Sequence, residues 1–195
     1  ASGDDYLSDP SMFPWTMGWQ PSIREEGRIY ANYIQAYPLV GMQLMQVRLR
    51  HEAHREELRP IIEAEATSWA VAMVTEAEID RINILKASLL GMHMAVDKLT
   101  VKPELLLIDG PHFVPYWGIT HHCVIKGDAI YASIAAASIL AKTHRDEYMN
   151  HLHLQYPQYG WNENKGYGTA LHRNKIVELG ITPHHRKTFG ICKGM

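Results

Sequence analysis

The chain has 195 residues, a formal net charge of −2, 46% hydrophobic residues and 21% charged residues. This length suits one domain with a substantial core, and the composition is ordinary for a soluble globular protein. The near-neutral charge excludes a chain that binds nucleic acid through overall basicity, and no apolar run approaches the roughly 18 residues of a membrane helix.

The cysteines and the N-terminus set the expected compartment. Cys123 and Cys192 are not in a CxxC spacing, so the sequence predicts neither a disulfide framework nor a zinc site. The first residues lack the basic-then-apolar pattern of a signal peptide. We therefore expect a cytoplasmic protein that has no contact with membranes and acts as a monomer.

The first half of the chain predicts alternating strands and helices. Residues 1–28 show no clean period, whereas 29–40 are rich in aromatic and β-branched residues and predict one or two strands. Residues 51–65 have a helical composition, with Pro60 as a kink or break. The continuous apolar run 69–74 has the length of a buried strand.

Two helices are expected next. Thr75 is a typical N-cap because Glu76 and Glu78 follow it in the first turn. Residues 83–99 place apolar side chains at helical spacing and predict an amphipathic helix.

Asp109 ends a short apolar strand predicted at 105–108, and Gly110 follows it. Ligands of open α/β sheets bind beyond the carboxyl ends of the strands, which makes Asp109 a candidate site residue. The alternative is an Asx turn that only leads the chain out of the strand.

A second aspartate, Asp128, follows a strand predicted at 122–126. It stands just before an apolar helix predicted from Ala129 to Asp146, which we expect to be buried. Asp128 is either the cap of this helix or a ligand. Two carboxylates that each follow a strand can face one point, and oxygen ligands suit Mg²⁺ or Mn²⁺.

The C-terminal part predicts a turn at 156–161, a loop at 162–169 and a helix that Thr169 caps and Gly180 ends. The residues 182–189 are expected to form an extended tail. From Lys165 onward the chain has six basic residues and one acidic residue, a net charge of +5, which fits either a polyanion partner or an ordinary solvated surface. Tyr167 lies between two glycines, where its ring either contacts a ligand or folds back onto its loop.

Residues from about Trp69 to Phe189 resemble ribonuclease HII, the type 2 ribonuclease H of bacteria. The resemblance is carried by motifs in family order and spacing: EIDRINILKASLLGMHMAVDKL, LLIDG, IKGD, SIAAASILAKTHRD, QYPQYGW, NKGYGT and TPHHRKTF. It implies an α/β fold with a ribonuclease H-like mixed central sheet flanked by helices. It further implies a single domain over 1–195, with an atypical segment 1–50 and a C-terminal helical extension and basic tail over 150–195.

The resemblance also implies an activity and a set of site residues. The family cleaves RNA in RNA/DNA hybrids and at ribonucleotides embedded in duplex DNA, using two Mg²⁺ or Mn²⁺ ions held by four carboxylates. Asp109 and Asp128 match the third and fourth of these ligands, and Tyr167 matches a tyrosine that stacks on the deoxyribose after the ribonucleotide. Asp146 matches an acidic position that supports Lys142 or Arg145. The expected phosphate contacts are Lys126, Lys165, Arg186 and Lys187.

The N-terminal segment departs from the family pattern because it has no Asp-Glu-Ala-Gly-Arg-Gly motif. The counterpart of the first two ligands is Asp4 with Asp5, and a rival counterpart is the segment 25–28, Glu-Glu-Gly-Arg. The resemblance as a whole implies a metal-dependent endoribonuclease that gives 5′-phosphate and 3′-hydroxyl products. The alternatives are a catalytically impaired protein that binds hybrids or duplexes on the same fold, and a nuclease with altered substrate choice.

Overall fold

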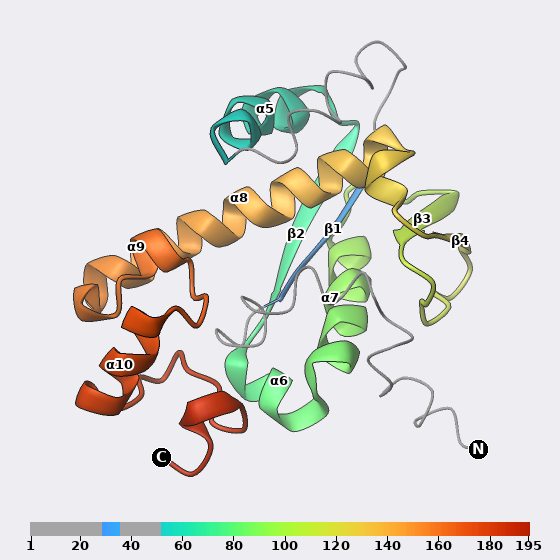
Figure 1. Cartoon of the computed structure of the whole chain (residues 1–195). Coiled ribbons are helices and arrows are strands. Elements are labelled where there is room, and N and C mark those ends of the chain that lie inside the picture. The colour runs from blue at the N-terminus through green and yellow to red at the C-terminus, as the bar shows by residue number, and fades with distance from the viewer. Residues whose placement is uncertain (1–28, 36–51) are drawn as a thin grey trace. The chain divides into compact units, whose positions relative to one another are not determined.

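The computed structural model of the chain describes residues 29–35 and 52–195. The chain divides into two compact units. We call them the central unit, formed by Gly91–His144 with the described residues of Tyr30–Ala72, and the C-terminal unit, formed by Met73–Leu90 and Arg145–Met195. Figure 1 labels their helices and strands.

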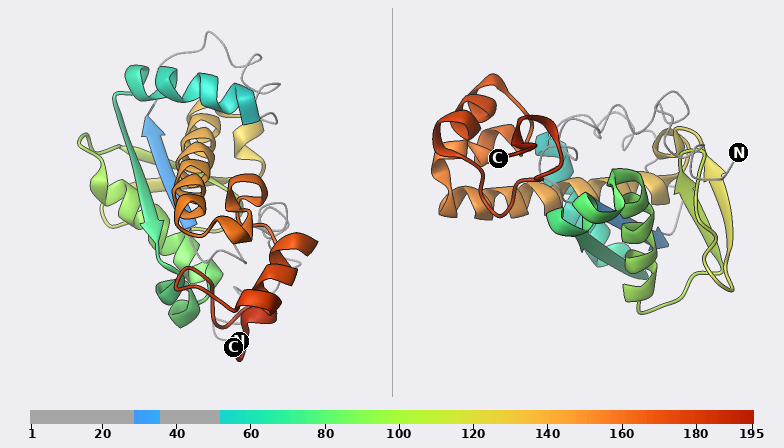
Figure 2. Two further views of the ribbon diagram at one scale, coloured as in Figure 1. Left: turned by 90° about the vertical axis from the view of Figure 1, so that its left-hand side faces the viewer. Right: turned by 90° about the horizontal axis from the view of Figure 1, so that it is seen from below.

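Four strands are described, and they pair two by two. Strand β1 (Ile29–Gln35) pairs with β2 (Ser68–Val74), and the two lie side by side in Figures 1 and 2. Strand β3 (Leu105–Asp109) pairs in parallel with β4 (Thr120–Val124). The strands expected at 69–74 and 105–108 are thus confirmed. Strand β4 begins and ends two residues earlier than expected, because Ile125 is exposed and Lys126 adopts a left-handed backbone conformation.

Helices cover strand β2 in the central unit. Trp69 and Val71 of β2 pack with Ile139 and Leu140 of α8 (Ala132–Gln155) and with residues of α5 (Glu52–Glu65). Ala72 packs instead against Ala95 of α7 (Ile84–Lys98). This alternation along β2 is the pattern of a strand that is covered on both faces.

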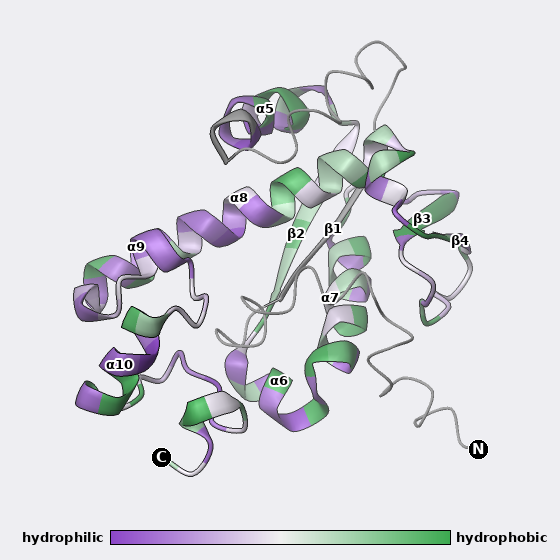
Figure 3. Ribbon diagram, in the orientation of Figure 1, coloured by the Kyte–Doolittle hydropathy of each residue, from purple (hydrophilic) through white to green (hydrophobic). Residues whose placement is uncertain are grey.

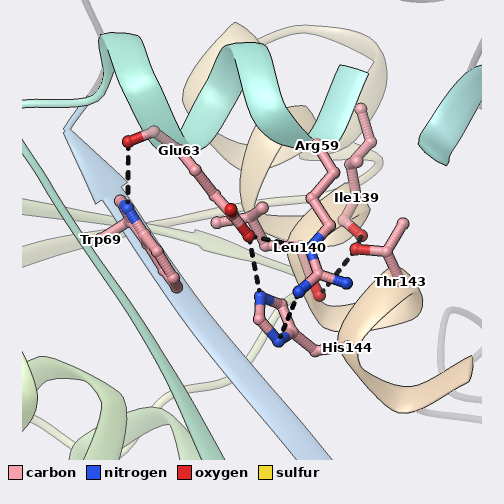
Figure 4. A network of polar contacts seen from close by, with 7 residues as sticks. All are labelled: Arg59, Glu63, Trp69, Ile139, Leu140, Thr143 and His144. Atoms are coloured by element: carbon pink, nitrogen blue, oxygen red, sulfur yellow. Dashed lines mark hydrogen bonds and ion pairs between the residues drawn. The ribbon is translucent and has the colours of Figure 1, made fainter. Parts of the chain in front are cut away.

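A polar network joins α5 to α8 beside this core (Figure 4). Glu63 of α5 lies at its centre, because its Oε1 accepts a hydrogen bond from Arg59 Nε at 2.8 Å and lies 3.0 Å from His144 Nε2. The backbone carbonyl of Glu63 accepts a bond from Trp69 Nε1 at 3.2 Å. Thr143 donates to the carbonyl of Ile139 one turn earlier in α8. The network therefore fixes how α5 lies along the first half of α8.

Local capping explains where several helices begin. Thr75 accepts a hydrogen bond from the Glu78 amide, as expected of the N-cap of α6 (Glu76–Ile82). Asn83 accepts bonds from the amides of Leu85 and Lys86 at the start of α7. Helix α5 continues through Pro60, so of the expected kink or break the structure excludes the break.

Helix α8 differs from its prediction at both ends. It begins at Ala132 rather than Ala129, because Gly127–Ala129 form a separate 3₁₀ turn. It runs to Gln155, so Asp146 lies within the helix and not at its end. No glycine or proline occurs between Asp128 and Pro157. The helix therefore continues although its composition changes from apolar to polar along its length (Figure 3).

The C-terminal unit is built from short helices around aromatic side chains. Helix α9 (Trp161–Asn164) occupies the first half of the segment expected to be a loop, and α10 (Ala170–Leu179) has the predicted Thr169 cap and Gly180 end. Tyr159 and Trp161 stack with ring centroids 5.3 Å apart and are buried with Met149, Leu152 and Ile176. A stacked pair of aromatic rings therefore forms part of the core of the C-terminal unit.

The expected extended tail at 182–189 is wrong, because these residues form turns that are held by α6. Asp80 of α6 accepts hydrogen bonds from the Lys187 amide at 2.7 Å and from the Thr188 hydroxyl. His184 Nδ1 lies 3.3 Å from Glu76 Oε1. Glu76 and Asp80 of α6 thus hold residues 182–189 in place.

None of the helices in the described part of the chain has the length and apolarity needed to span a membrane.

Candidate metal and nucleic-acid site

Asp109 ends strand β3 beside the turn that follows β4. Its Oδ1 accepts a hydrogen bond from the Gly127 amide at 2.8 Å. The two strands are parallel and in register from Leu105 opposite Thr120 to Asp109 opposite Val124, so their carboxyl ends lie at the same edge. This is the edge at which open α/β sheets bind ligands.

Asp128 lies in the 3₁₀ turn Gly127–Ala129 and is partly buried. Lys126 leads into the turn with a left-handed backbone (φ 55°), and the carbonyl of Gly127 accepts bonds from the amides of Ile130 and Tyr131. The turn therefore separates Asp128 from Ala132, the first residue of α8.

The charge of Asp128 acts on Asp109. Burial raises the pKa of Asp109 above its ordinary value, and the charge of Asp128 raises it further. The amide of Gly127, the charge of Lys142 and the amide of Gly110 oppose this by stabilising the ionised form. Asp109 and Asp128 are thus close enough to repel, and a bound cation would relieve that repulsion.

The donor set fits a hard divalent cation. Asp109 and Asp128 offer only carboxylate oxygens, which are the ligands that Mg²⁺ and Mn²⁺ prefer. In the ranges 29–35 and 52–195 no cluster of three or more His, Cys, Asp or Glu residues suited to a metal ion occurs. The described part of the chain therefore supplies a pair of candidate ligands and not a complete cage.

Gly127 makes the close approach between the turn and Asp109 possible. A Cβ atom at this position would lie 2.5 Å from Ile134 Cδ1 and 3.4 Å from Asp109 Oδ1. Ile134 is buried in the first turns of α8, so it cannot move away without cost.

Replacing Gly127 with Ala is expected to destabilise the protein by roughly 1–3 kcal/mol through overpacking and to reduce cleavage by displacing Asp109. Urea unfolding and cleavage assays measure the two effects. The added substitution Ile134→Val removes Cδ1, the atom in the closest contact, and should restore part of both losses. If G127A alone unfolds and cleaves like the unchanged protein, Gly127 has no role in placing Asp109.

Lys142 and Asp146 were both expected to support the site. Lys142 Nζ donates to Ser138 Oγ at 2.8 Å, one turn earlier in α8, and its charge acts on Asp109. Asp146 contacts Arg145, with Arg145 Nη1 3.3 Å from Asp146 Oδ1. Of the two expected pairings for Asp146, the structure thus shows the one with Arg145.

Tyr167 lies in the loop between α9 and α10 in the C-terminal unit. Its side chain is 41% exposed, and the guanidinium carbon of Arg145 lies 5.6 Å from its ring centroid. The ring is therefore packed on a cation and remains open to solvent, and the contact with a sugar stays a prediction.

The four basic residues expected to contact phosphates have different environments. Lys126 and Lys187 are exposed. Lys165 is partly buried and donates to Asn150 Oδ1 at 2.7 Å. Arg186 is buried, with Nε 3.5 Å from Asp80 Oδ1 and its guanidinium carbon 4.9 Å from the Phe189 ring centroid. A phosphate contact by Arg186 stays a prediction, and its burial favours a structural role.

The proposed first two ligands, Asp4 and Asp5, lie outside the described residues, as does the rival segment 25–28. Two residues that organise the site were not singled out in the sequence. Gly127 contacts Asp109, and Asn164 holds the loop of Tyr167 by accepting a bond from the Gly166 amide at 2.8 Å. Gly127 precedes Asp128 and Asn164 precedes Lys165, both of which were predicted site residues. This position in the sequence was the signal that could have indicated their role.

Comparisons with known proteins identify the family. A profile of ribonuclease HII matches residues 49–192. The chain belongs to the ribonuclease HII family. Ribonuclease HII of Parabacteroides distasonis is 62% identical over 138 residues, which cover 71% of this chain and 69% of that protein. The enzyme of Bacteroides thetaiotaomicron is 60% identical over 140 residues, or 72% and 70% of the two chains.

Solved structures show the same fold. The ribonuclease H2 of Pyrococcus horikoshii superposes with a TM-score of 0.69 at 20% identity, covering 86% of this chain and 89% of that one. The ribonuclease HII of Archaeoglobus fulgidus, solved in complex with PCNA, gives a TM-score of 0.63 at 19% identity, with 88% and 95% covered. The ribonuclease H-like fold class is therefore confirmed. Members of the family are metal-dependent endonucleases that cleave RNA in RNA/DNA hybrids.

Proposed function

We propose that this chain is an endonuclease that cleaves the RNA strand of RNA/DNA hybrids and single ribonucleotides embedded in duplex DNA, giving 5′-phosphate and 3′-hydroxyl ends. The observation that carries the proposal is the placement of two carboxylates, Asp109 and Asp128, after the parallel strands β3 and β4 at the carboxyl edge of their sheet, in a chain of this family.

In this proposal Asp109 and Asp128 hold divalent cations, Mg²⁺ or Mn²⁺, with further ligands from the N-terminal segment. Two such ions, when bound, activate water and stabilise the departing 3′-oxygen. The chain's own contribution is to orient Asp109, since the Gly127 amide donates to Asp109 Oδ1. This contact holds Asp109 in place before a metal binds. Ser138 accepts a hydrogen bond from the ammonium of Lys142, whose charge acts on Asp109.

Residues of each unit are proposed to bind the nucleic acid. Tyr167 stacks on the deoxyribose after the ribonucleotide, and exposed lysines such as Lys126 and Lys187 neutralise phosphates. Binding should therefore weaken steeply as the salt concentration rises.

The second candidate is a protein on the same fold that binds ribonucleotide-containing duplexes without cutting them. It is favoured by the start of the family match at residue 49, which leaves Asp4, Asp5 and segment 25–28 outside it. Without the first two ligands, the second metal is difficult to hold.

The test is cleavage of a DNA duplex with one embedded ribonucleotide, of a continuous RNA/DNA hybrid and of a plain DNA duplex, each with Mg²⁺ and with Mn²⁺. The proposal expects a single cut on the 5′ side of the embedded ribonucleotide, cleavage of the hybrid and none of the plain duplex. Salt-sensitive binding without cleavage would support the second candidate instead. Cutting of the plain DNA duplex would indicate altered substrate choice.

A further inference from the structure

The loop that carries Tyr167 has an unusual backbone. Lys165 and Gly166 both adopt positive φ angles, 46° and 79°. Asn164 holds the bend from one side, because its carbonyl accepts the Tyr167 amide at 2.7 Å and its Oδ1 accepts the Gly166 amide at 2.8 Å. Asn164 is itself buried and donates from Nδ2 to the Tyr159 carbonyl at 2.7 Å. The loop is thus anchored to the aromatic core of the C-terminal unit.

Arg145 of α8 also holds this loop, through a hydrogen bond to its backbone. It is only 8% exposed, and its Nη2 donates a hydrogen bond to the carbonyl of Lys165, the residue at which the backbone bends. Its Nη1 lies 3.3 Å from Asp146 Oδ1, and Asp146 is also 8% exposed. A buried guanidinium is costly unless it is paired and hydrogen-bonded, and both conditions are met here.

The same guanidinium packs on the Tyr167 ring, with its carbon 5.6 Å from the ring centroid. This distance lies within the range of a cation–π contact. A single side chain therefore binds the bend of the loop through one nitrogen and contacts the ring through its planar group. Tyr167 is 41% exposed, so part of the residue remains accessible to a ligand.

We propose that Arg145, paired with Asp146, is a positioning residue that fixes the orientation of the Tyr167 ring before substrate binds. The proposal rests on the proposed function, in which Tyr167 stacks on a sugar of the substrate. A ring already held in place does not lose rotamer freedom on binding, and this lowers the cost of forming the complex. Arginine suits the task because its planar group stacks and donates at once, whereas lysine is a point charge.

The central experiment is a double-mutant cycle with Arg145→Met, Tyr167→Ala and the double variant, assayed on the duplex with one embedded ribonucleotide. Each single variant is expected to lower kcat/KM by about 10- to 100-fold, the size of effect that misplaced binding groups produce. If Arg145 acts through Tyr167, the double variant should be no worse than Y167A. R145K should restore only part of the loss.

Arg81→Met is the matched control. Arg81 is exposed in the same C-terminal unit and pairs only with Glu78 of its own helix among the described contacts, so its removal changes the charge equally. Its kcat/KM is expected to match that of the unchanged protein. Fold losses of R145M and Y167A that multiply in the double variant would overturn the proposal, because a general loss of structure would combine in that way.

Amide hydrogen exchange of residues 166–168 provides a readout that does not need activity. R145M should accelerate exchange there, and R81M should not. If the unchanged protein cleaves none of the ribonucleotide substrates, the proposed function fails, and the exchange measurement still decides whether Arg145 orders the loop. Equal exchange in R145M and the unchanged protein would overturn the positioning role.

Discussion

Replacing Asp109 with Asn is expected to reduce cleavage by about 10³-fold or more, because it removes a carboxylate that we propose as a ligand of the divalent cation. The substitution keeps the shape of the side chain and an oxygen that can accept the Gly127 amide bond, now 2.8 Å long. The loss should therefore come from the missing charge and not from a collapsed site. Cleavage of the duplex with one embedded ribonucleotide measures it, and wild-type rates in D109N would contradict the assignment of Asp109 as a ligand.

The same substitution should stabilise the metal-free protein. Burial and Asp128 raise the pKa of Asp109 in the folded state, so folding disfavours its ionised form. The contribution of this group to stability is full below the unfolded pKa of about 3.9 and is lost as the pH rises through the folded value. The amide side chain introduced by D109N does not titrate, so D109N does not lose this contribution. In EDTA the free energy of unfolding of D109N should exceed that of the unchanged protein by a small amount at pH 4 and by a larger amount at pH 7.

Thermal unfolding with and without Mg²⁺ separates the two effects. The unchanged protein should gain stability from the cation, since a ligand that binds only the folded state raises the midpoint, and D109N should gain less. Glu104→Gln serves as the control, because Glu104 is exposed next to the same strand. A lower midpoint for D109N in EDTA would mean that the Gly127 bond to the charged carboxylate outweighs burial and repulsion.

How far the sequence predicted the fold depended on whether the signal was local. Thr75, Thr169 and Gly180 lie where predicted, because a cap is determined by a few neighbouring residues. Asp109 lies at the end of β3 as predicted, because the apolar run that predicts the strand stops there. The ends of α8 were missed, since Gly127 starts a 3₁₀ turn whose geometry depends on contacts with Asp109 and Ile134.

The conformation of residues 182–189 also depends on contacts that are distant in the sequence. Residues 182–189 were expected to be extended, but Asp80 lies about a hundred positions earlier in the chain and holds two of their backbone amides. Such a contact has no local signature. The Thr-Pro-His-His-Arg segment of this chain thus has a structural role, because His184 and Arg186 contact Glu76 and Asp80 of α6.

His185 of this motif is expected to make the protein sensitive to acid. Its side chain is 2% exposed, and its Nδ1 accepts a bond from the Thr182 amide at 3.0 Å, which requires a neutral ring at that nitrogen. The ring stacks on His172 with centroids 5.3 Å apart. Burial, followed by the charge of His172, lowers the pKa of His185 to about 4.

The sign of the effect follows from proton uptake. Above pH 6.5 the ring is neutral in both states, so His185 does not change the stability. Between about pH 6.5 and 4 the unfolded chain binds a proton that the folded chain does not, and the free energy of unfolding falls. The full loss is roughly 3 kcal/mol, reached when the pH has dropped through the folded pKa. His172, whose pKa burial also lowers, contributes in the same direction.

Urea unfolding of the unchanged protein and of His185→Asn between pH 4 and 7.5 measures this loss. Asparagine keeps an acceptor near the Thr182 amide and does not titrate, so H185N should be less stable at pH 7.5 and lose less stability on acidification. The exposed His151 provides the control, and H151N should follow the unchanged protein across the range. Parallel curves for H185N and the unchanged protein would show that the buried ring does not drive acid unfolding, and the stacked pair would then have to be protonated in the folded state.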